Sequence, residues 1–114
     1  ILSIQFPLNR ALHAFDEELG RKVQLNDTYE IGIVDHGILR QMDYYSSGIK
    51  DVIWFCERMA FIQRLSVKEK PVIVLDDIFL ALDHEMQKKA FNMIGRISQD
   101  FQIIYLSCHE YAVL

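Results

Sequence analysis

Several classes of protein are excluded by what the sequence has little of. The 114 residues include two cysteines, Cys56 and Cys108, which lack the short spacing of a metal-binding or redox-active pair. Isolated cysteines of this kind are usually small buried side chains in a reducing compartment, so we expect a cytoplasmic protein. No apolar run approaches the roughly 20 residues of a membrane helix, and the N-terminus lacks the pattern of a signal peptide.

Positive charge is also scarce. The net charge of −4 argues against a chain that coats nucleic acid by itself, because phosphate binding needs clustered Lys and Arg. Any contact with DNA would therefore use other parts of the molecule. With 51% hydrophobic and 25% charged residues, the chain fits one globular domain over 1–114. It begins at Ile1 rather than Met, which suggests a fragment of a longer protein.

The N-terminal part of the chain predicts a helix followed by short strands. Pro7 suits a first helical turn, apolar residues recur at helical spacing up to Leu19, and Gly20 offers a stop, so one amphipathic helix is expected. Alternating apolar residues then predict strands at 23–25, 29–33 and 38–42. Asn26-Asp27 and His36-Gly37 supply the turns between them.

The remaining chain predicts a long helix and then a strand, helix and strand. The segment 49–65 is apolar on almost every face, which predicts a helix buried on most sides. The β-branched run 72–75 predicts a strand covered on both faces, as in a parallel sheet. Asp83 suits the N-cap of the next helix, and 103–106 predicts a second buried strand, which completes a βαβ unit.

Polar residues follow both predicted parallel strands, where ligands of such sheets collect. Asp76 and Asp77 follow the first strand, and Ser107, Cys108 and His109 follow the second. An acidic pair after a strand is typical of phosphoryl-transfer enzymes, in which one carboxylate faces Mg²⁺ and the other an attacking water. The alternative is that the acidic pair merely ends a strand in solvent and that the histidine is structural.

A third candidate is the triplet Ser46-Ser47-Gly48, which precedes the long helix. A hydroxyl, free backbone N–H groups and the positive end of the helix dipole together suit a phosphate. Simple helix capping explains the same residues equally well.

Four segments in this order resemble motifs of ABC-type ATPase heads of the SMC and SbcC class, closest to YhaN-like AAA-domain proteins. The segment 45–51 (YSSGIKD) is similar to the divergent ABC signature of SbcC-like and YhaN-like proteins. The segment 71–77 (PVIVLDD) resembles a Walker B strand, 81–83 (ALD) a D-loop and 105–110 (YLSCHE) an H-loop. The implied fold is α/β: the C-terminal half of a P-loop NTPase, with parallel strands, flanking helices and a small N-terminal β-hairpin region. The segment 1–20 would lead in from a coiled-coil arm.

The resemblance also implies roles. Ser46, Ser47 and Gly48 would meet the γ-phosphate of ATP bound mainly to a partner head, and Asp83 would communicate across the dimer. In its own head, Asp76 would hold Mg²⁺ through water.

Asp77 would orient or deprotonate the attacking water, and His109 would touch the γ-phosphate. The sequence departs from the common pattern at Asp77, where most ABC proteins have Glu, and at Ser47 and Ile49, which replace a glycine and a Gln or Glu.

The Walker A pattern G-x-x-x-x-G-K-[ST] does not occur, since none of the five glycines is followed by Lys. In SMC and SbcC relatives that loop lies in an N-terminal lobe, which would be this chain's first partner. A second head would be the second partner, in an ATP-dependent homodimer. DNA would be a third partner, by analogy with the family.

Three hypotheses follow. The first is half of an ATPase site, inactive alone, that serves DNA repair or chromosome maintenance. The second is an ATP-gated dimerisation scaffold that does not hydrolyse ATP. The third is an unrelated Mg²⁺ phosphohydrolase that uses Asp76, Asp77 and His109 directly.

Overall fold

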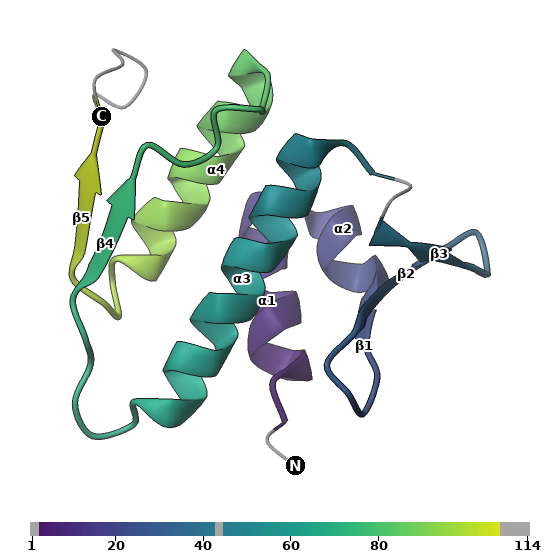
Figure 1. The fold of residues 1–114 in the computed structure, drawn as a ribbon, viewed down its shortest axis with the longest axis horizontal. Helices are drawn as coiled ribbons and strands as arrows, with labels where there is room; N and C mark the ends of the chain where they lie inside the picture. Colours follow the sequence, from purple (N-terminus) through teal and green to yellow (C-terminus); the bar gives the residue numbers. More distant parts are fainter. Residues whose placement is uncertain (1–2, 43–44, 108–114) are drawn as a thin grey trace.

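The computed structural model describes residues 3–42 and 45–107 (Figure 1). The chain forms a flat body with principal extents of 39 × 36 × 19 Å. Its elements, in order, are α1 (Gln5–Phe15), α2 (Glu17–Lys22), β1 (Val23–Leu25), β2 (Ile31–Asp35), β3 (Ile38–Gln41), α3 (Ser47–Leu65), β4 (Ile73–Asp76), α4 (His84–Ile97) and β5 (Ile103–Leu106). The strands form two separate sheets, β1-β2-β3 and β4-β5.

The single N-terminal helix expected from the apolar spacing is instead two helices. The backbone is extended at Asp16, with φ −152° and ψ 119°, which ends α1 at Phe15. The Asp16 carboxylate then accepts hydrogen bonds from the backbone N–H groups of Glu18 and Leu19, which makes it the N-cap of α2. The apolar spacing continues through this break because Phe15 and Leu19 are buried in the same core cluster. The prediction of one helix was wrong, and so was the stop at Gly20, since α2 continues to Lys22.

The antiparallel sheet β1-β2-β3 confirms the predicted strands, with the last two joined through the turn at His36 and Gly37. Its β1 edge is occupied by amide side chains of α1. Leu25 N donates to Gln5 Oε1 at 2.8 Å, and Gln5 Nε2 donates to Val23 O at 3.1 Å. Asn9 Nδ2 also donates to Val23 O, at 3.0 Å. Among the described residues, the β3 edge pairs with no further strand, so the sheet is open on that side only.

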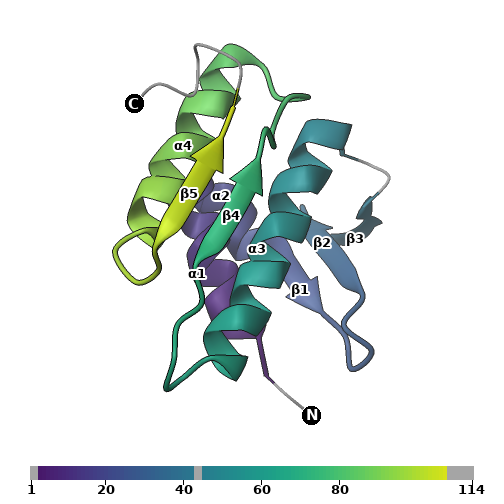
Figure 2. The ribbon, with the colours of Figure 1, turned by 60° about the vertical axis from the view of Figure 1, so that its left-hand side comes forward.

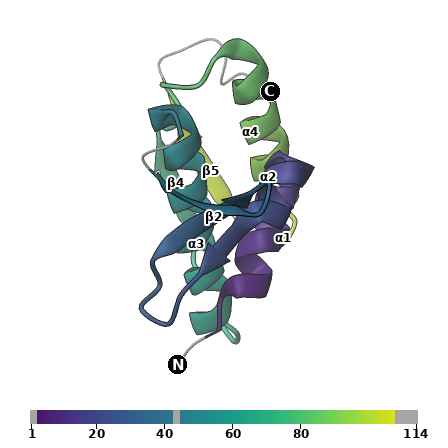
Figure 3. The same ribbon diagram turned by 90° about the vertical axis from the view of Figure 1, so that its right-hand side faces the viewer.

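Helix α3 crosses the centre of the molecule (Figures 1 and 3). The prediction of a helix here is confirmed, but burial on most sides is wrong for this chain. One face is buried, whereas Trp54 is 47% exposed and Asp51 and Arg58 are also exposed. The buried face carries Gly48, Val52, Ile53, Cys56, Met59 and Ala60.

The parallel pair β4-β5 is covered on one face only. In register, Ile73 lies opposite Ile103 and Leu75 opposite Tyr105. These side chains point toward the helices, because alternate residues of a strand face opposite sides. Within 3–42 and 45–107 the other face is bare, so the prediction of a strand covered on both faces does not hold for the described residues. The exposed fractions are 42–58% for Val72, Val74, Ile104 and Leu106.

The core lies where α1 contacts both α3 and α4. Leu8 and Leu12 of α1 belong to one buried cluster with Ile53 of α3 and Met93 of α4, and all four side chains are fully buried. Cys56 is buried, as predicted, and its sulfur lies beside that of Met93. Burial raises the pKa of the Cys56 thiol. Within the described residues, no helix is long and apolar enough to cross a membrane.

The contact between α1 and the β1 edge gives a stability prediction. Replacement Gln5→Ala leaves the part-buried Leu25 N–H without its side-chain acceptor, and a hydrogen bond of this kind contributes about 0.5–1.5 kcal/mol net. We expect the free energy of unfolding, measured by urea denaturation, to fall by that amount. The control Arg10→Ala alters an exposed position of the same helix and should change the free energy of unfolding by less than about 0.5 kcal/mol. Equal effects of the two variants would show that the amide contact does not stabilise the sheet edge.

Candidate functional site

Four chain segments meet at one end of the molecule (Figures 1 and 2). They are the N-terminus of α3, the carboxyl ends of β4 and β5, and the N-terminus of α4. The predicted site segments 45–51, 76–77, 81–83 and 105–107 all belong to these ends. The structure therefore gathers the described part of each predicted motif at one end of the fold.

The N-terminus of α3 begins with a side-chain cap. Ser46 Oγ accepts a hydrogen bond from Ile49 N at 3.3 Å, so the capping interpretation is confirmed. The hydroxyl hydrogen of Ser46 remains available to donate. The first N–H groups of a helix have no partner within it, so the backbone of Ser47 and Gly48 can also donate. This helix end retains the donors that a phosphate needs.

Gly48 lies directly against the loop that follows β4. A Cβ atom on Gly48 would sit 2.8 Å from Leu82 Cδ2 and 2.9 Å from the carbonyl oxygen of Ala81. Both distances are shorter than real Cβ contacts allow, and the carbonyl is backbone that cannot rotate away. Glycine at this position is what lets α3 approach the loop this closely, which ties the signature-like segment to the D-loop-like segment.

The acidic pair has two different environments. Asp76 ends β4 and is exposed, and its carboxylate makes no hydrogen bond or ion pair with the described residues. Asp77 is half-buried and has a left-handed backbone with φ 48°. Its N–H donates to Leu106 O at 2.8 Å, and its Oδ1 accepts a hydrogen bond from Ser107 Oγ at 2.8 Å. Asp77 is therefore oriented by the end of β5, whereas Asp76 is open to solvent.

The loop after Asp77 is strained and fixed at several points. Phe79 also has a left-handed backbone, with φ 68°, which is costly for a bulky side chain. The Phe79 ring is buried and packs edge-on against Phe55 of α3, with centroids 5.4 Å apart. Tyr105 Oη donates to Ile78 O at 2.7 Å. Strain of this kind persists only where packing holds it, and here both α3 and β5 hold it.

Asp83 is an N-cap in this structure, as the sequence predicted. Its Oδ1 accepts a hydrogen bond from Met86 N at 2.8 Å and so begins α4. The residue is exposed, which leaves it accessible to a partner at the same end of the molecule.

Two predicted residues, Cys108 and His109, lie outside the described residues. Within 3–42 and 45–107, no cluster of three or more His, Cys, Asp or Glu side chains is arranged to hold a metal ion. An open carboxylate such as Asp76 suits Mg²⁺, which commonly binds one or two carboxylates and takes its other ligands from water and phosphate. The described residues thus fit a shared magnesium site but not one built from protein alone.

A groove of about 650 Å³ runs beside the acidic pair, between α3 and β4. Among the described strands, β4 pairs with β5 only, so its other edge opens into this groove. The groove is mainly apolar and is lined in part by Trp54, Phe55, Met59, Val74, Ile78 and Leu80. It continues the apolar surface of the bare β4-β5 face.

Sequence reasoning gave no role to Phe79, Tyr105 or the Ser107 hydroxyl. Tyr105 alternates with exposed residues of β5, and a tyrosine at a buried strand position needs a hydrogen-bond partner for its hydroxyl. That rule indicates an acceptor nearby but does not identify the loop carbonyl of Ile78.

The fold is similar to that of a solved structure from work on ATP-driven dimerisation and DNA-stimulated activation of SMC ATPases. The TM-score is 0.70 at 17% sequence identity, and the match covers 95% of this chain and 68% of that one. No family model and no curated protein matches the sequence. At this identity the likeness concerns the fold alone: a small mixed α/β domain arranged as in part of an SMC ATPase head, which confirms the expected SMC-like architecture.

The close contact at Gly48 predicts opposite outcomes for two glycine-to-alanine changes. Gly48→Ala forces α3 away from the Ala81 carbonyl and should destabilise the protein by about 1–3 kcal/mol. Gly95 lies at an exposed position of α4, where an added Cβ meets nothing within 4 Å. Gly95→Ala should therefore stabilise the protein by about 0.5–1 kcal/mol through helix propensity. Thermal unfolding of both variants measures these two changes in stability. A neutral Gly48→Ala would mean that α3 and the loop are not in close contact.

Proposed function

We propose that this chain is the C-terminal lobe of an SMC-like and SbcC-like ATPase head, which supplies half of an ATP site. The observation that carries the proposal is the contact of Gly48 with Ala81 and Leu82. It joins the signature-like helix end to the loop after the acidic pair, so the motifs that are ordered in the sequence are also joined in space. The SMC-like fold supports the same proposal.

The helix end of α3 is the phosphate-binding part of the half-site. Ser46 would donate its hydroxyl, and Ser47 and Gly48 their backbone N–H groups, to the γ-phosphate of ATP held mainly by a second head. The partial positive charge at the N-terminus of a 19-residue helix favours the same anion. Asp83 lies exposed at this end and would meet the second head there.

The acidic pair would serve the nucleotide of its own head. Bound Mg²⁺ supplies charge neutralisation for the phosphates. Asp76, exposed at the end of β4, would accept hydrogen bonds from water molecules around that ion. Asp77, held by Ser107, would orient or deprotonate the attacking water. His109, outside the described residues, would touch the γ-phosphate.

The bare β4-β5 face indicates where a Walker A lobe of the same protein would pack. Four apolar side chains, Val72, Val74, Ile104 and Leu106, are about half exposed on this face, and both outer edges of the pair are open within the described residues. An isolated pair of strands is only marginally stable in water. A covering lobe with further strands would bury the apolar face and complete the sheet.

The biological process is inferred from the family only. SMC-like and SbcC-like ATPases act on DNA, so we propose a role in DNA repair or chromosome maintenance, inside the cell. The net charge of −4 favours DNA contacts made by other parts of the complete protein.

A second function, an ATP-gated dimerisation scaffold, is favoured by the environment of Asp77. Its side chain is one methylene shorter than the usual Glu, and one carboxylate oxygen already accepts the Ser107 hydroxyl. A carboxylate engaged in this way reaches less far toward an attacking water. The scaffold would close on ATP through Ser46 and Gly48 without turnover.

Turnover by the reconstituted head, this chain together with its Walker A lobe, separates these functions. We expect Mg²⁺-dependent ATP hydrolysis that falls at least about 100-fold in Asp76→Asn and in Asp77→Asn, since each variant removes a carboxylate charge. Glu69→Gln, a change of equal charge in an exposed loop, should leave the rate unchanged.

ATP-induced dimerisation, followed by sedimentation, is the second readout. Asp77→Asn should still dimerise, whereas Ser46→Ala should weaken ATP-induced dimerisation. Dimerisation without turnover in the unaltered head would instead establish the scaffold. Steady turnover by this chain alone, abolished by Asp77→Asn, would overturn the half-site and favour an independent phosphohydrolase.

A further inference from the structure

Hydrogen bonds join the end of β5 to the first two residues of the loop that follows β4. Asp77 N donates to Leu106 O at 2.8 Å, and Ser107 Oγ donates to Asp77 Oδ1 at 2.8 Å. Tyr105 Oη donates to Ile78 O at 2.7 Å. Figure 2 shows β4 and β5 side by side, with their carboxyl ends at the same end of the molecule. The end of β5 therefore holds both the backbone and the side chain of Asp77.

The place of Ser107 beside Asp77 follows from the parallel register of the two strands. Asp76 lies opposite Leu106, so the next pair along the strands is Asp77 and Ser107. The backbone turns left-handed at Asp77, with φ 48°, and β4 ends at Asp76. Strand alternation therefore no longer fixes the direction of the Asp77 side chain. A hydroxyl from the neighbouring strand fixes it instead.

The left-handed backbone also bears on the residue type at position 77. Apart from glycine, Asp and Asn adopt this conformation more readily than most residues, because their short polar side chains can hydrogen-bond nearby groups. Aspartate has one side-chain torsion fewer than the glutamate of the common pattern. A single hydrogen bond to its carboxylate therefore leaves little freedom in the side chain of Asp77.

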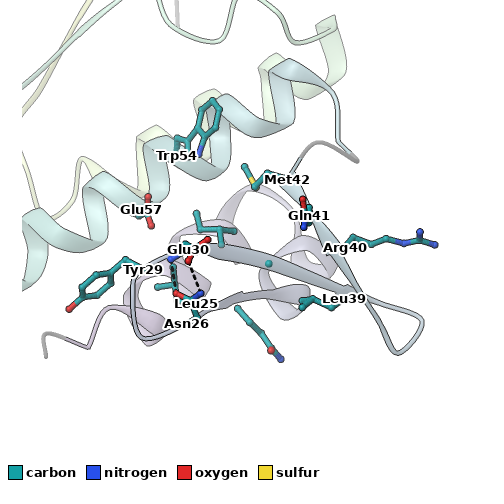
Figure 4. A pocket seen from close by; sticks show the side chains of 13 residues that line it. Leu25, Asn26, Tyr29, Glu30, Leu39, Arg40, Gln41, Met42, Trp54 and Glu57 are labelled. Carbon is teal, nitrogen blue, oxygen red and sulfur yellow. Dashed lines mark hydrogen bonds between the residues drawn. The ribbon is translucent and has the colours of Figure 1, made fainter.

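A bond of the same kind elsewhere in the structure has a local role. It lies beside a cavity of about 570 Å³ between α3 and the antiparallel sheet (Figure 4). Thr28 Oγ1 donates to Glu30 Oε1 at 2.8 Å, and Asn26 Nδ2 donates to the same oxygen at 3.3 Å. These residues belong to one turn, so their hydrogen bonds order that turn. The bond from Ser107 spans 30 positions and joins two strand ends, so turn formation does not explain it.

We propose that Ser107 is a positioning residue for Asp77 in ATP hydrolysis, an inference that rests on the proposed function of the acidic pair. The Ser107 hydroxyl fixes the direction of the carboxylate, so the carboxylate meets the attacking water in one orientation. A group that is oriented before the reaction avoids the cost of being ordered during it, and a small misplacement lowers the rate. Ser107 acts through Asp77 and is not itself a catalytic residue.

Turnover by the complete protein at saturating Mg²⁺-ATP tests this role. Ser107→Ala should lower kcat at least about tenfold, which corresponds to about 1.4 kcal/mol of activation free energy. KM and ATP-induced dimerisation should stay unchanged, because Ser107 lies outside the helix end that would bind the phosphate. Ser107→Thr keeps a hydroxyl at the same position and should restore most of the lost kcat.

Two comparisons separate positioning from a merely structural role. In the Asp77→Asn background, Ser107→Ala should cause no further loss of kcat, because the carboxylate that Ser107 positions is already gone. Thr28→Ala removes an exposed hydroxyl that donates to a carboxylate at the same distance of 2.8 Å, and it should leave kcat unchanged.

The outcomes distinguish this inference from the proposed function. An unchanged or raised kcat in Ser107→Ala, with turnover still lost in Asp77→Asn, would overturn the inference and leave the proposed function intact. Equal losses of kcat in Ser107→Ala and Ser107→Thr would overturn it as well, because the hydroxyl would then not matter. No turnover in the unaltered protein would overturn both.

Discussion

The close approach of α3 to the loop after β4 is the constraint on which the proposed site depends. At Gly48 the helix backbone reaches the carbonyl of Ala81, and two turns further on Phe55 packs against Phe79. These two contacts, with the hydrogen bond from Tyr105, hold a loop whose backbone is left-handed at Asp77 and Phe79. The backbone of this loop therefore depends on where α3 lies, while Ser107 of the β5 end holds the Asp77 carboxylate. A shift of α3 would therefore change the backbone of the loop that carries Asp77, even if no residue of that loop were substituted.

Much of the fold could be predicted because local rules and tertiary structure agree. An apolar segment located α3 and helical apolar spacing located α4. Alternation located the strands of the antiparallel sheet, and continuous apolar runs located β4 and β5. Ser46 and Asp83 proved to be the caps that their residue types indicate. The failures have two physical causes. The break at Asp16 continues the same buried side, so periodicity could not detect it. The apolar runs of α3 and β4 suggested full burial because a sequence does not tell whether the covering surface belongs to the same chain.

The candidate site was predictable as a set of segments but not as a geometry. The position of Asp76 and Asp77 after a strand indicated the sheet edge where polar groups gather. The hydrogen bond from Ser107 to Asp77 joins residues 30 positions apart and depends on the register of β4 with β5, which periodicity does not supply.

The one-sided cover of β4 and β5 has a consequence for the life of the protein in the cell. Among the residues that the structure describes, this strand pair has open edges and exposed valine, isoleucine and leucine, and such a pair is a template for pairing with other chains. A copy that has not found its covering surface would be prone to aggregation and a substrate for chaperones and proteases. A lobe on which the covering surface has docked would no longer offer this template, so the time that the face stays bare during folding sets the risk.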